Sequence, residues 1–325
     1  MSAPAASPRA FALGRRRFRD QVGDSTLFGL TGGASFAAVG LVGLLVYELF
    51  HQSWPAIEEF GLGFITSHAW DPVKNEFGAL DFIWGTLYTS ALAVLLAAPL
   101  SIAIGLFLSE LAPRGVRGIV GALVEMLAAI PSVVIGLWGV FIVGPFIHDH
   151  LAPFLDRTLG WTPFFSGGVP AAGNTLLTAV IVLTIMIIPI TASISRELFL
   201  TVPEELEQGS LALGMTRWEM VRGVVLPYTR GGVVAAVILG LGRAIGEAIA
   251  VTQVIGGLLG IHISLFESGD TLASRIAAQY QGAATDIQVA SLVYLALILL
   301  AISLITNFIA QLIVRRFEFQ RVGGD

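Results

Sequence analysis

Six long apolar stretches constrain this chain more than any other feature of its sequence. A helix needs about 20 residues to cross the roughly 30 Å of hydrocarbon in a bilayer. Helices also satisfy every backbone hydrogen bond inside one segment, as the bilayer interior requires. The sequence therefore predicts an all-α integral membrane protein with six transmembrane helices. The predicted spans run from Leu27 to Phe50, Trp84 to Leu108, Ile119 to Ile147, Thr175 to Ser195, Gly231 to Leu259 and Ile287 to Val314.

The composition agrees with this prediction and removes several kinds of chemistry. Of the 325 residues, 55% are hydrophobic and only 13% are charged, which is typical of an integral membrane protein. The chain has no cysteine, so disulfides, thiol catalysis and thiolate metal sites are excluded. The five histidines are scattered along the sequence, and no metal site is predicted.

Positive charges set the predicted orientation. Of the 18 Lys and Arg residues, only Lys74, Arg157, Arg243 and Arg275 lie outside the hydrophilic segments on the side of the N-terminus. Cytoplasmic segments carry the excess of Lys and Arg, so both termini are predicted to be cytoplasmic. The expected parts are a disordered cytoplasmic tail over 1–26, a transmembrane domain over 27–314 with a cytoplasmic loop over 196–230, and a cytoplasmic tail over 315–325.

The cytoplasmic loop 196–230 is charged and helix-forming, although it lies between apolar runs. Thr201 and Thr216 each stand three residues before a glutamate, which is the spacing of a capping box. Gly214 is expected to end the first helix in a left-handed conformation, and Pro227 is expected to end the second. The pattern predicts two short helices joined by a tight turn.

Two charged residues are predicted inside the fifth span. Counted from Gly231 at about 1.5 Å per residue, Arg243 lies roughly 18 Å into the span, with Glu247 one turn further on the same face. Charges at this depth are expensive, and they usually face a protein interior or a water-filled path. The two residues can therefore form a mutually neutralising contact that orders the helix bundle, or they can be polar contacts for a substrate along a transport route. Glu247 can hold Arg243 in position or disfavour some anions.

The third span contains a proline break at Ile130-Pro131-Ser132. Ser132 can line a pore, or its hydroxyl can satisfy backbone groups freed by the proline. Arg243 bears on the substrate class, because a guanidinium binds oxyanions, and phosphate in particular, through two parallel hydrogen bonds. Both residues are candidates for a substrate path.

The chain lacks a phosphate-binding loop of the GxxxxGK[ST] type. Lys74 is its only lysine, and the residue directly before it is not the glycine that this motif requires. We therefore expect the chain not to be an enzyme, and we expect its driving force to come from another subunit or from an ion gradient. A secondary carrier or a channel is the alternative from a different class.

The loop sequence resembles the cytoplasmic motif of the permeases of binding-protein-dependent ABC importers: Glu-Ala-Ala, three residues, Gly, nine residues, Ile, any residue, Leu-Pro. The spacing is kept here by Gln208-Gly209-Ser210, Gly214, Val224 and Leu226-Pro227. Gln208 stands in place of the family's glutamate, with Glu207 beside it. The resemblance implies a MetI-like permease domain and coupling to an ATPase through Glu204, Glu205, Glu207, Gln208, Gly214 and Arg217.

More narrowly, three segments resemble permease subunits of phosphate-specific ABC importers: Ala128 to Phe146, Leu211 to Val233 and Leu239 to Gly257. This resemblance implies a bacterial plasma-membrane protein that moves inorganic phosphate inward by alternating access, past Arg243 and Glu247. It implies a companion permease (PstA-like), an ATPase dimer (PstB-like) that binds ATP and Mg, and an external phosphate-binding protein (PstS-like). The chain itself would contact lipid, bind no nucleic acid and hold no cofactor. A permease for molybdate, sulfate or phosphonate is the alternative within the class.

Overall fold

Six helices are long and apolar enough to cross a membrane in the computed structural model, which describes residues 9–170 and 172–322. They correspond one to one to the predicted spans, so the prediction of a six-helix membrane protein is confirmed. With an even number of spans, the N-terminal end of the first span and the C-terminal end of the last lie on the same side of the membrane. The Arg-rich segments identify that side as the cytoplasm. The spans are Ser25–Phe60, Leu80–Leu111, Ser132–Leu159, Leu176–Phe199, Arg217–Gly246 and Asp286–Val314.

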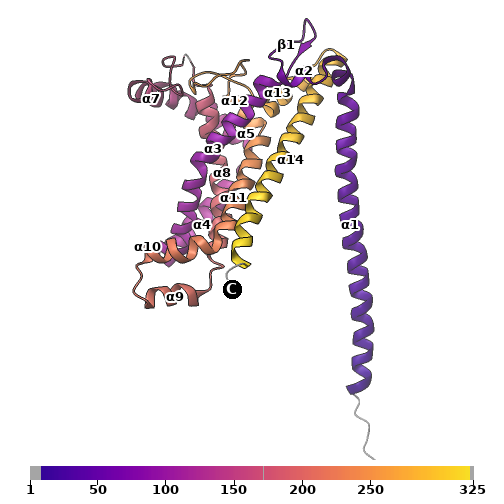
Figure 1. Cartoon of the computed structure of the whole chain (residues 1–325), viewed down its shortest axis with the longest axis vertical. Helices are drawn as coiled ribbons and strands as arrows, with labels where there is room; N and C mark the ends of the chain where they lie inside the picture. The colour runs from indigo at the N-terminus through magenta and orange to yellow at the C-terminus, as the bar shows by residue number, and fades with distance from the viewer. Residues whose placement is uncertain (1–8, 171, 323–325) are drawn as a thin grey trace, which may run out of the picture. The chain divides into compact units, whose positions relative to one another are not determined.

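Shorter helices and one small hairpin complete the fold (Figure 1). In chain order the elements are α1 Arg9–Phe60, α2 Gly63–Thr66, β1 Trp70–Asp71, β2 Glu76–Phe77, α3 Leu80–Leu106, η1 Phe107–Leu111, α4 Arg114–Ala128, α5 Ser132–Trp138, η2 Gly139–Val143, α6 Gly144–Phe146, η3 Ile147–Leu151, α7 Ala152–Leu159, α8 Leu176–Phe199, α9 Glu204–Ala212, α10 Arg217–Met220, η4 Val221–Val225, α11 Leu226–Gly246, α12 Ile249–Val254, α13 Leu272–Gln279, η5 Tyr280–Gly282 and α14 Asp286–Val322. Of the η segments, η1 to η4 are π-helical and η5 is a 3₁₀-helix.

The contacts divide the chain into two compact units, Met1–Gln52 and Ser53–Asp325. In the first unit α1 begins at Arg9, so the prediction of a disordered tail is wrong for residues 9–26, where Ala and Arg favour a helix. Residues 1–8 of the predicted tail lie outside the described residues, as do 323–325 of the predicted C-terminal tail. Over residues 27–48 the apolar side chains of the first span are exposed.

The second unit is built around α8, the most buried of the six spans. Helices α3 and α11 pack against α8, and α14 packs against α11. Small residues allow this close approach: a Cβ at Gly240 of α11 would lie 2.7 Å from Ile187 of α8, and a Cβ at Gly105 of α3 would lie 3.1 Å from the Arg196 nitrogen. Membrane helices associate through such close packing because the lipid provides no hydrophobic driving force between them.

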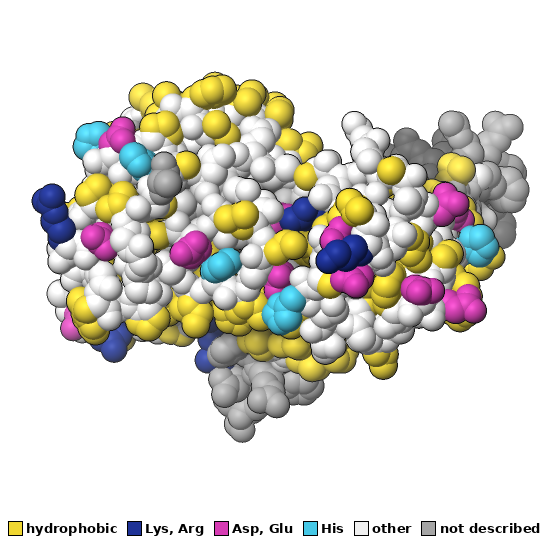
Figure 2. Space-filling view, turned by 90° about the horizontal axis from the view of Figure 1, so that it is seen from above, with side chains coloured by type: hydrophobic (Ala, Val, Ile, Leu, Met, Phe, Trp, Pro, Cys, Tyr) yellow, Lys and Arg dark blue, Asp and Glu magenta, His cyan; other side chains and the backbone are white. Residues whose placement is uncertain are grey.

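The outer end of this unit carries α2, α7, α13 and the β1–β2 hairpin, and α9 and α10 lie at the opposite, cytoplasmic end (Figure 1). The hairpin is antiparallel, with Trp70 opposite Phe77. In the view from above, basic, acidic and histidine side chains are interspersed with apolar ones and form no single patch of one sign (Figure 2).

Two predicted span boundaries are wrong. The third apolar helix begins at Ser132 and continues to Leu159, through residues expected in an outer loop, while α4 is a separate helix before the proline break. The fifth predicted span does not form one helix to Leu259, because α11 ends at Gly246 and α12 starts again at Ile249.

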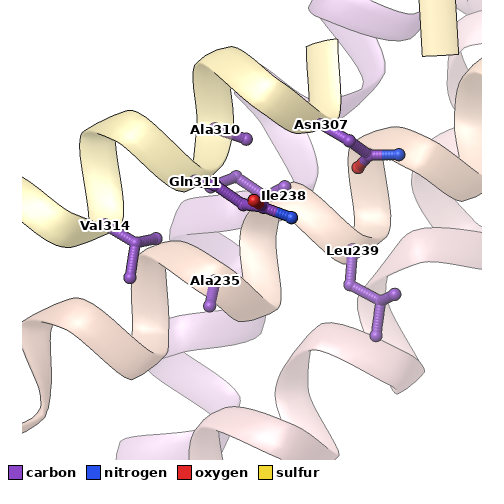
Figure 3. Close-up of a pocket in the computed structure, with 7 residues that line it drawn as sticks. All are labelled: Ala235, Ile238, Leu239, Asn307, Ala310, Gln311 and Val314. Atoms are coloured by element: carbon purple, nitrogen blue, oxygen red, sulfur yellow. The ribbon is translucent and has the colours of Figure 1, made fainter. Parts of the chain in front are cut away.

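Helices α11 and α14 enclose a groove of about 380 Å³ (Figure 3). Its lining is apolar except for the carboxamides of Asn307 and Gln311, which lie one turn apart on α14. Both side chains are exposed at the groove.

Candidate transport path and coupling loop

The first helix of the cytoplasmic loop is α9, and its start differs from the prediction. Thr201 does not cap it: the Thr201 hydroxyl donates to the Leu198 carbonyl oxygen at 2.7 Å, and Pro203 takes the N-cap position without a side-chain bond. The predicted capping box at Thr201 is therefore wrong. Its hydroxyl satisfies a carbonyl at the end of α8, a local bond that competes with capping.

The turn and the second helix follow the prediction. Gly214 has φ of +89°, the left-handed conformation that glycine adopts at little cost. The Thr216 hydroxyl accepts a hydrogen bond from the Glu219 amide at 3.3 Å, and Glu219 Oε2 accepts one from the Thr216 amide at 2.8 Å. This reciprocal pair is the predicted capping box. It fixes the start of α10.

The second helix does not end at Pro227, contrary to the prediction. The helix continues from Arg217 to Gly246, and a π-helical turn precedes the proline, with the Leu226 amide bonded to the Val221 carbonyl oxygen. A proline ring clashes with the carbonyl four residues earlier in a regular α-helix, and a wider π turn relieves that clash. The second loop helix and the fifth span are therefore one helix, which places Arg217 and Arg243 about 39 Å apart along its axis.

The loop has an exposed apolar surface and a polar inner cleft. Leu213 is 84% exposed and Trp218 is 67% exposed. The cleft, of about 520 Å³, lies between the loop and the end of α3–η1. Of the predicted coupling residues, Glu204, Glu207, Gln208 and Arg217 line this cleft, whereas Glu205 and Gly214 lie outside it and are exposed.

Glu207 is a half-buried acid of the cleft. Burial raises its pKa, and the neighbouring charges of Glu110 and Glu204 raise it further. Gln208 occupies the motif position that carries a glutamate in the family. Because Gln208 is uncharged, it adds no further negative charge to the cleft beside Glu204 and Glu207.

Two arginines bind the cytoplasmic end of the second span, and neither contact was predicted from the sequence. Arg217 donates from Nη1 to the Glu110 carbonyl oxygen at 3.2 Å, and Arg117 of α4 donates to the Ser109 carbonyl oxygen. The last carbonyls of a helix lack partners within it and carry the negative end of its dipole, so they suit arginine. The cluster of Arg114 and Arg117 just after the span was the available signal.

Arg243 lies in the last turn of α11, and its side chain is exposed. Among the described residues no hydrogen bond or ion pair to its guanidinium is found. The mutually neutralising contact with Glu247, one of the two alternatives, is therefore not formed in this structure, in which α11 ends at Gly246. Glu247 has extended backbone angles, and its Oε1 accepts a hydrogen bond from the Ala250 amide at 3.3 Å, at the start of α12. This carboxylate caps the next helix.

Ser132 is the first residue of α5, directly after the break at Pro131. A Cβ at Gly136 would meet Ala250, and a Cβ at Gly139 would meet Val254, so α5 and α12 pack in parallel. Their N-terminal ends, at Ser132 and next to Glu247, therefore lie at the same level. The structure thus brings Ser132 and Glu247 to one level beside two helix breaks. The N-terminal ends of interrupted membrane helices can face anions, and at α12 the carboxylate of Glu247 already occupies that end.

Six apolar spans, two interrupted helices and a cytoplasmic helical loop continuous with the fifth span define a membrane transport permease. Residues 101–319 match the family model described as "Binding-protein-dependent transport system inner membrane component". The chain belongs to this family, whose members are transport subunits of ABC importers rather than their ATPases.

Relatives and solved structures agree with the family. The chain is 41% identical to phosphate transport system permease protein PstC of Mesorhizobium japonicum over 91% of both chains, and 43% identical to PstC of Pasteurella multocida over 86% of this chain and 87% of that protein. An inward-facing MetNI methionine ABC transporter chain matches with a TM-score of 0.53 and 21% identity, covering 73% of this chain and 94% of its own. A bacterial alginate ABC transporter chain matches with a TM-score of 0.58 and 17% identity, covering 90% of this chain and 97% of its own. The two structures support the fold.

Proposed function

We propose that this chain is a permease subunit of an ATP-driven importer that moves inorganic phosphate into the cytoplasm. The observation that carries the proposal is the identity of 41% and 43% to two PstC phosphate permeases over most of both chains. Identity at this level over most of both chains supports a shared substrate class as well as a shared fold.

The exposed guanidinium of Arg243 supports the route of the substrate. Arg243 has no partner among the described residues and projects from a membrane-spanning helix, where an unpaired charge is expensive. A companion permease that covers this face would enclose it, and phosphate passing between the two subunits would supply the missing anion. Arg243 binds the oxyanion, and Glu247 and Ser132 border the same region.

The cytoplasmic loop supports coupling to an ATPase. In this proposal a PstB-like ATPase dimer binds ATP and Mg, and the exposed Leu213 and Trp218 dock on it. Closure of that dimer moves α9 and α10, and the continuous helix carries the movement to Arg243. A PstA-like companion permease and an external PstS-like phosphate-binding protein complete the complex, which works by alternating access. The chain holds no cofactor of its own.

Reconstituted complexes test the proposal directly. Arg243→Ala is expected to lower ATP-dependent phosphate uptake about 10- to 100-fold, the loss expected for one charge-assisted hydrogen bond. Arg243→Lys keeps the charge without the planar fork, and its uptake should be intermediate. Arg157→Ala on the exposed outer surface of α7 is the matched control. Full uptake by Arg243→Ala would remove Arg243 from the path.

Competition separates the substrate alternatives. Excess molybdate, sulfate or phosphonate should leave uptake of labelled phosphate unchanged. Stronger inhibition by one of these anions than by unlabelled phosphate would assign the permease to that anion. Phosphate uptake without any ATPase subunit, driven by an ion gradient, would instead indicate a secondary carrier.

A further inference from the structure

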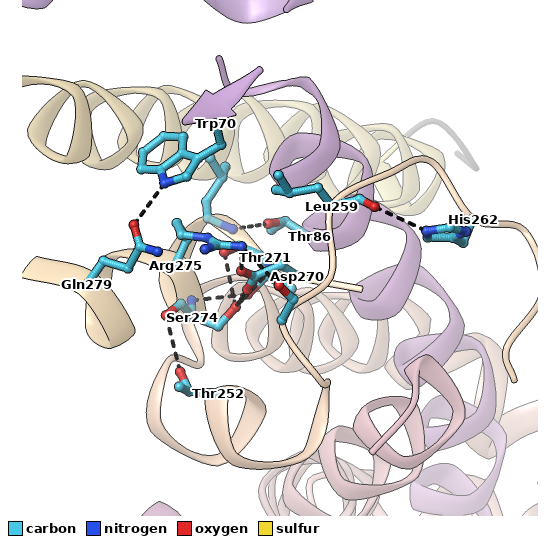
Figure 4. Close-up of polar contacts among 12 residues, drawn as sticks. Trp70, Thr86, Thr252, Leu259, His262, Asp270, Thr271, Ser274, Arg275 and Gln279 are labelled. Carbon is cyan, nitrogen blue, oxygen red and sulfur yellow. Dashed lines mark hydrogen bonds and ion pairs between the residues drawn. The ribbon is translucent and has the colours of Figure 1, made fainter. Parts of the chain in front are cut away.

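A buried ion pair at the outer end of the molecule lies outside the proposed substrate path. Arg275 and Asp270 approach to 2.7 Å between Nη2 and Oδ2, and their side chains are 10% and 5% exposed. The guanidinium carbon lies 4.9 Å from the ring centre of Phe82 on α3 and 5.8 Å from that of Trp70 on β1. Figure 4 shows Arg275 with Asp270 and Trp70. The pair is thus enclosed by aromatic rings from two other elements.

The same arginine binds the segment that follows α12. Arg275 donates from Nη2 to the Gly257 carbonyl oxygen at 3.1 Å, three residues after α12 ends. Within α12, the Thr252 hydroxyl donates to the Ala248 carbonyl oxygen at 2.6 Å and also lies 3.3 Å from the Ser274 carbonyl oxygen of α13 (Figure 4). Helix α12 is therefore attached to α13 from inside the helix and from just beyond its C-terminal end.

Asp270 is itself held in one orientation. Its Oδ1 accepts hydrogen bonds from the Thr271 amide at 2.8 Å and from the Ser274 hydroxyl. The aspartate thus braces the start of α13 and faces Arg275 with its second oxygen. Neither partner of the pair can turn away without leaving a buried charge unpaired.

Helix α3 fixes this assembly from the other side. The Thr86 hydroxyl accepts a hydrogen bond from the Leu272 amide at 2.9 Å. Gly85 lies so close to the Asp270 backbone that any Cβ would collide with the Asp270 carbonyl oxygen. Helices α3, α13 and α12 are therefore locked in one register around the ion pair.

A buried ion pair is weak evidence for stability, because apolar residues of similar volume often stabilise a fold equally well. A better-attested role of such a pair is to fix one packing arrangement of the elements around it. The start of α12 carries the Glu247 cap at the proposed path. We propose that Arg275 is a positioning residue that holds α12, and with it Glu247, in the register needed for transport. This inference rests on the proposed function for its transport readout.

Distance measurements between α12 and α3 test the positioning itself. Ile249 of α12 and Leu87 of α3 are 51% and 41% exposed, and the chain has no cysteine of its own, so Ile249→Cys and Leu87→Cys accept spin labels selectively in this subunit. In the assembled complex we expect a narrow label–label distance distribution. Arg275→Met should broaden it and lower phosphate uptake about ten-fold or more, since small misplacements near a site carry penalties of this size.

Further variants keep the test decisive. Asp270→Asn with Arg275→Met removes both charges, so the doubly neutral core should assemble even if Arg275→Met alone does not, and it should still broaden the distribution. Lys74→Met removes an exposed ion pair to Asp71 at the same end and should change neither readout. Leu295→Ala truncates a fully buried side chain of α14 and should lower thermal stability without broadening the distribution.

The outcomes separate this inference from the proposed function. A distribution that stays narrow in both Arg275 variants overturns the positioning role, whatever happens to uptake. Broadening with uptake within two-fold of the unmodified complex also overturns it. If the unmodified complex imports no phosphate, the proposed function fails, and the distance distributions still decide whether Arg275 holds α12.

Discussion

The guanidinium of Arg217 at the start of α10 binds the carbonyl oxygen of Glu110 at the end of the second span, at 3.2 Å. The residue lies in the loop that the family resemblance assigns to ATPase contact, yet it faces its own chain. It joins the loop to α3–η1, while the continuous helix joins the same loop to α11. A movement of the loop would therefore act on two spans at once.

Arg217→Ala should uncouple the complex. Without the bond to Glu110, the second span no longer follows the loop, so phosphate uptake should fall about ten-fold while ATP hydrolysis persists, as expected for loss of a hydrogen bond to a charged group. Parallel assays of ATP hydrolysis and phosphate uptake in proteoliposomes measure how much phosphate is imported per ATP hydrolysed. Arg222→Ala removes an exposed arginine from the same helix and is the control. Equal loss of both activities in Arg217→Ala would indicate failed docking instead.

Gly214 sets the angle between α9 and α10, and Gly214→Val should disrupt it. A β-branched residue at φ of +89° is strained by about 1–2 kcal/mol or more, so the turn should loosen and coupling should fall. Gly209→Ala is the matched control, since that glycine is helical and a Cβ there meets nothing within 4 Å. Hydrogen exchange across residues 201–220 should increase in Gly214→Val only. Unchanged exchange together with intact coupling would contradict the role of the turn.

Local rules and hydropathy predicted much of this structure. Six apolar runs identified the six spans because hydrocarbon excludes most other sequences. Gly214 and Thr216 were predicted correctly because a left-handed turn and a capping box depend on neighbours within a few residues.

The errors arose where a side chain or a tertiary contact overrode the local pattern. A π-helical turn lets the helix continue through Pro227. Glu247 does not continue α11, and its carboxylate instead caps the start of α12. The contacts of Arg217 with Glu110 and of Arg275 with Gly257 join residues distant in sequence. Neither follows from spacing along the chain.

The cleft behind the loop should respond to pH through Glu207. Burial and the charges of Glu110 and Glu204 raise its pKa in the folded state, so its ionised form is disfavoured there relative to the unfolded state. The resulting penalty is fully present above the raised folded pKa and disappears as pH falls through that value toward the ordinary pKa of glutamate. The loop should therefore become slightly more stable on mild acidification.

Glu207→Gln should reproduce the acidic state at neutral pH. Hydrogen exchange of α9, corrected for the intrinsic effect of pH, should slow in this variant at pH 7. It should also lose the dependence on pH that the unmodified protein shows just above the ordinary pKa of glutamate. Glu205→Gln neutralises an exposed acid outside the cleft and should behave like the unmodified protein. Identical exchange in the two variants would show that burial in the cleft has no effect on Glu207.

Gly85 permits the contact between α3 and the segment that starts α13, and Gly85→Ala should therefore destabilise the protein. The added methyl group would collide with the Asp270 carbonyl oxygen, which belongs to the backbone and cannot rotate away. Overpacking of this kind costs about 1–3 kcal/mol. The change should lower the thermal unfolding midpoint of the detergent-solubilised complex. Gly118→Ala in α4 is the matched control, because a Cβ there meets nothing within 4 Å and alanine favours a helix by about 1 kcal/mol over glycine. A midpoint that falls equally in both variants, or in neither, would contradict the close approach of α3 to Asp270.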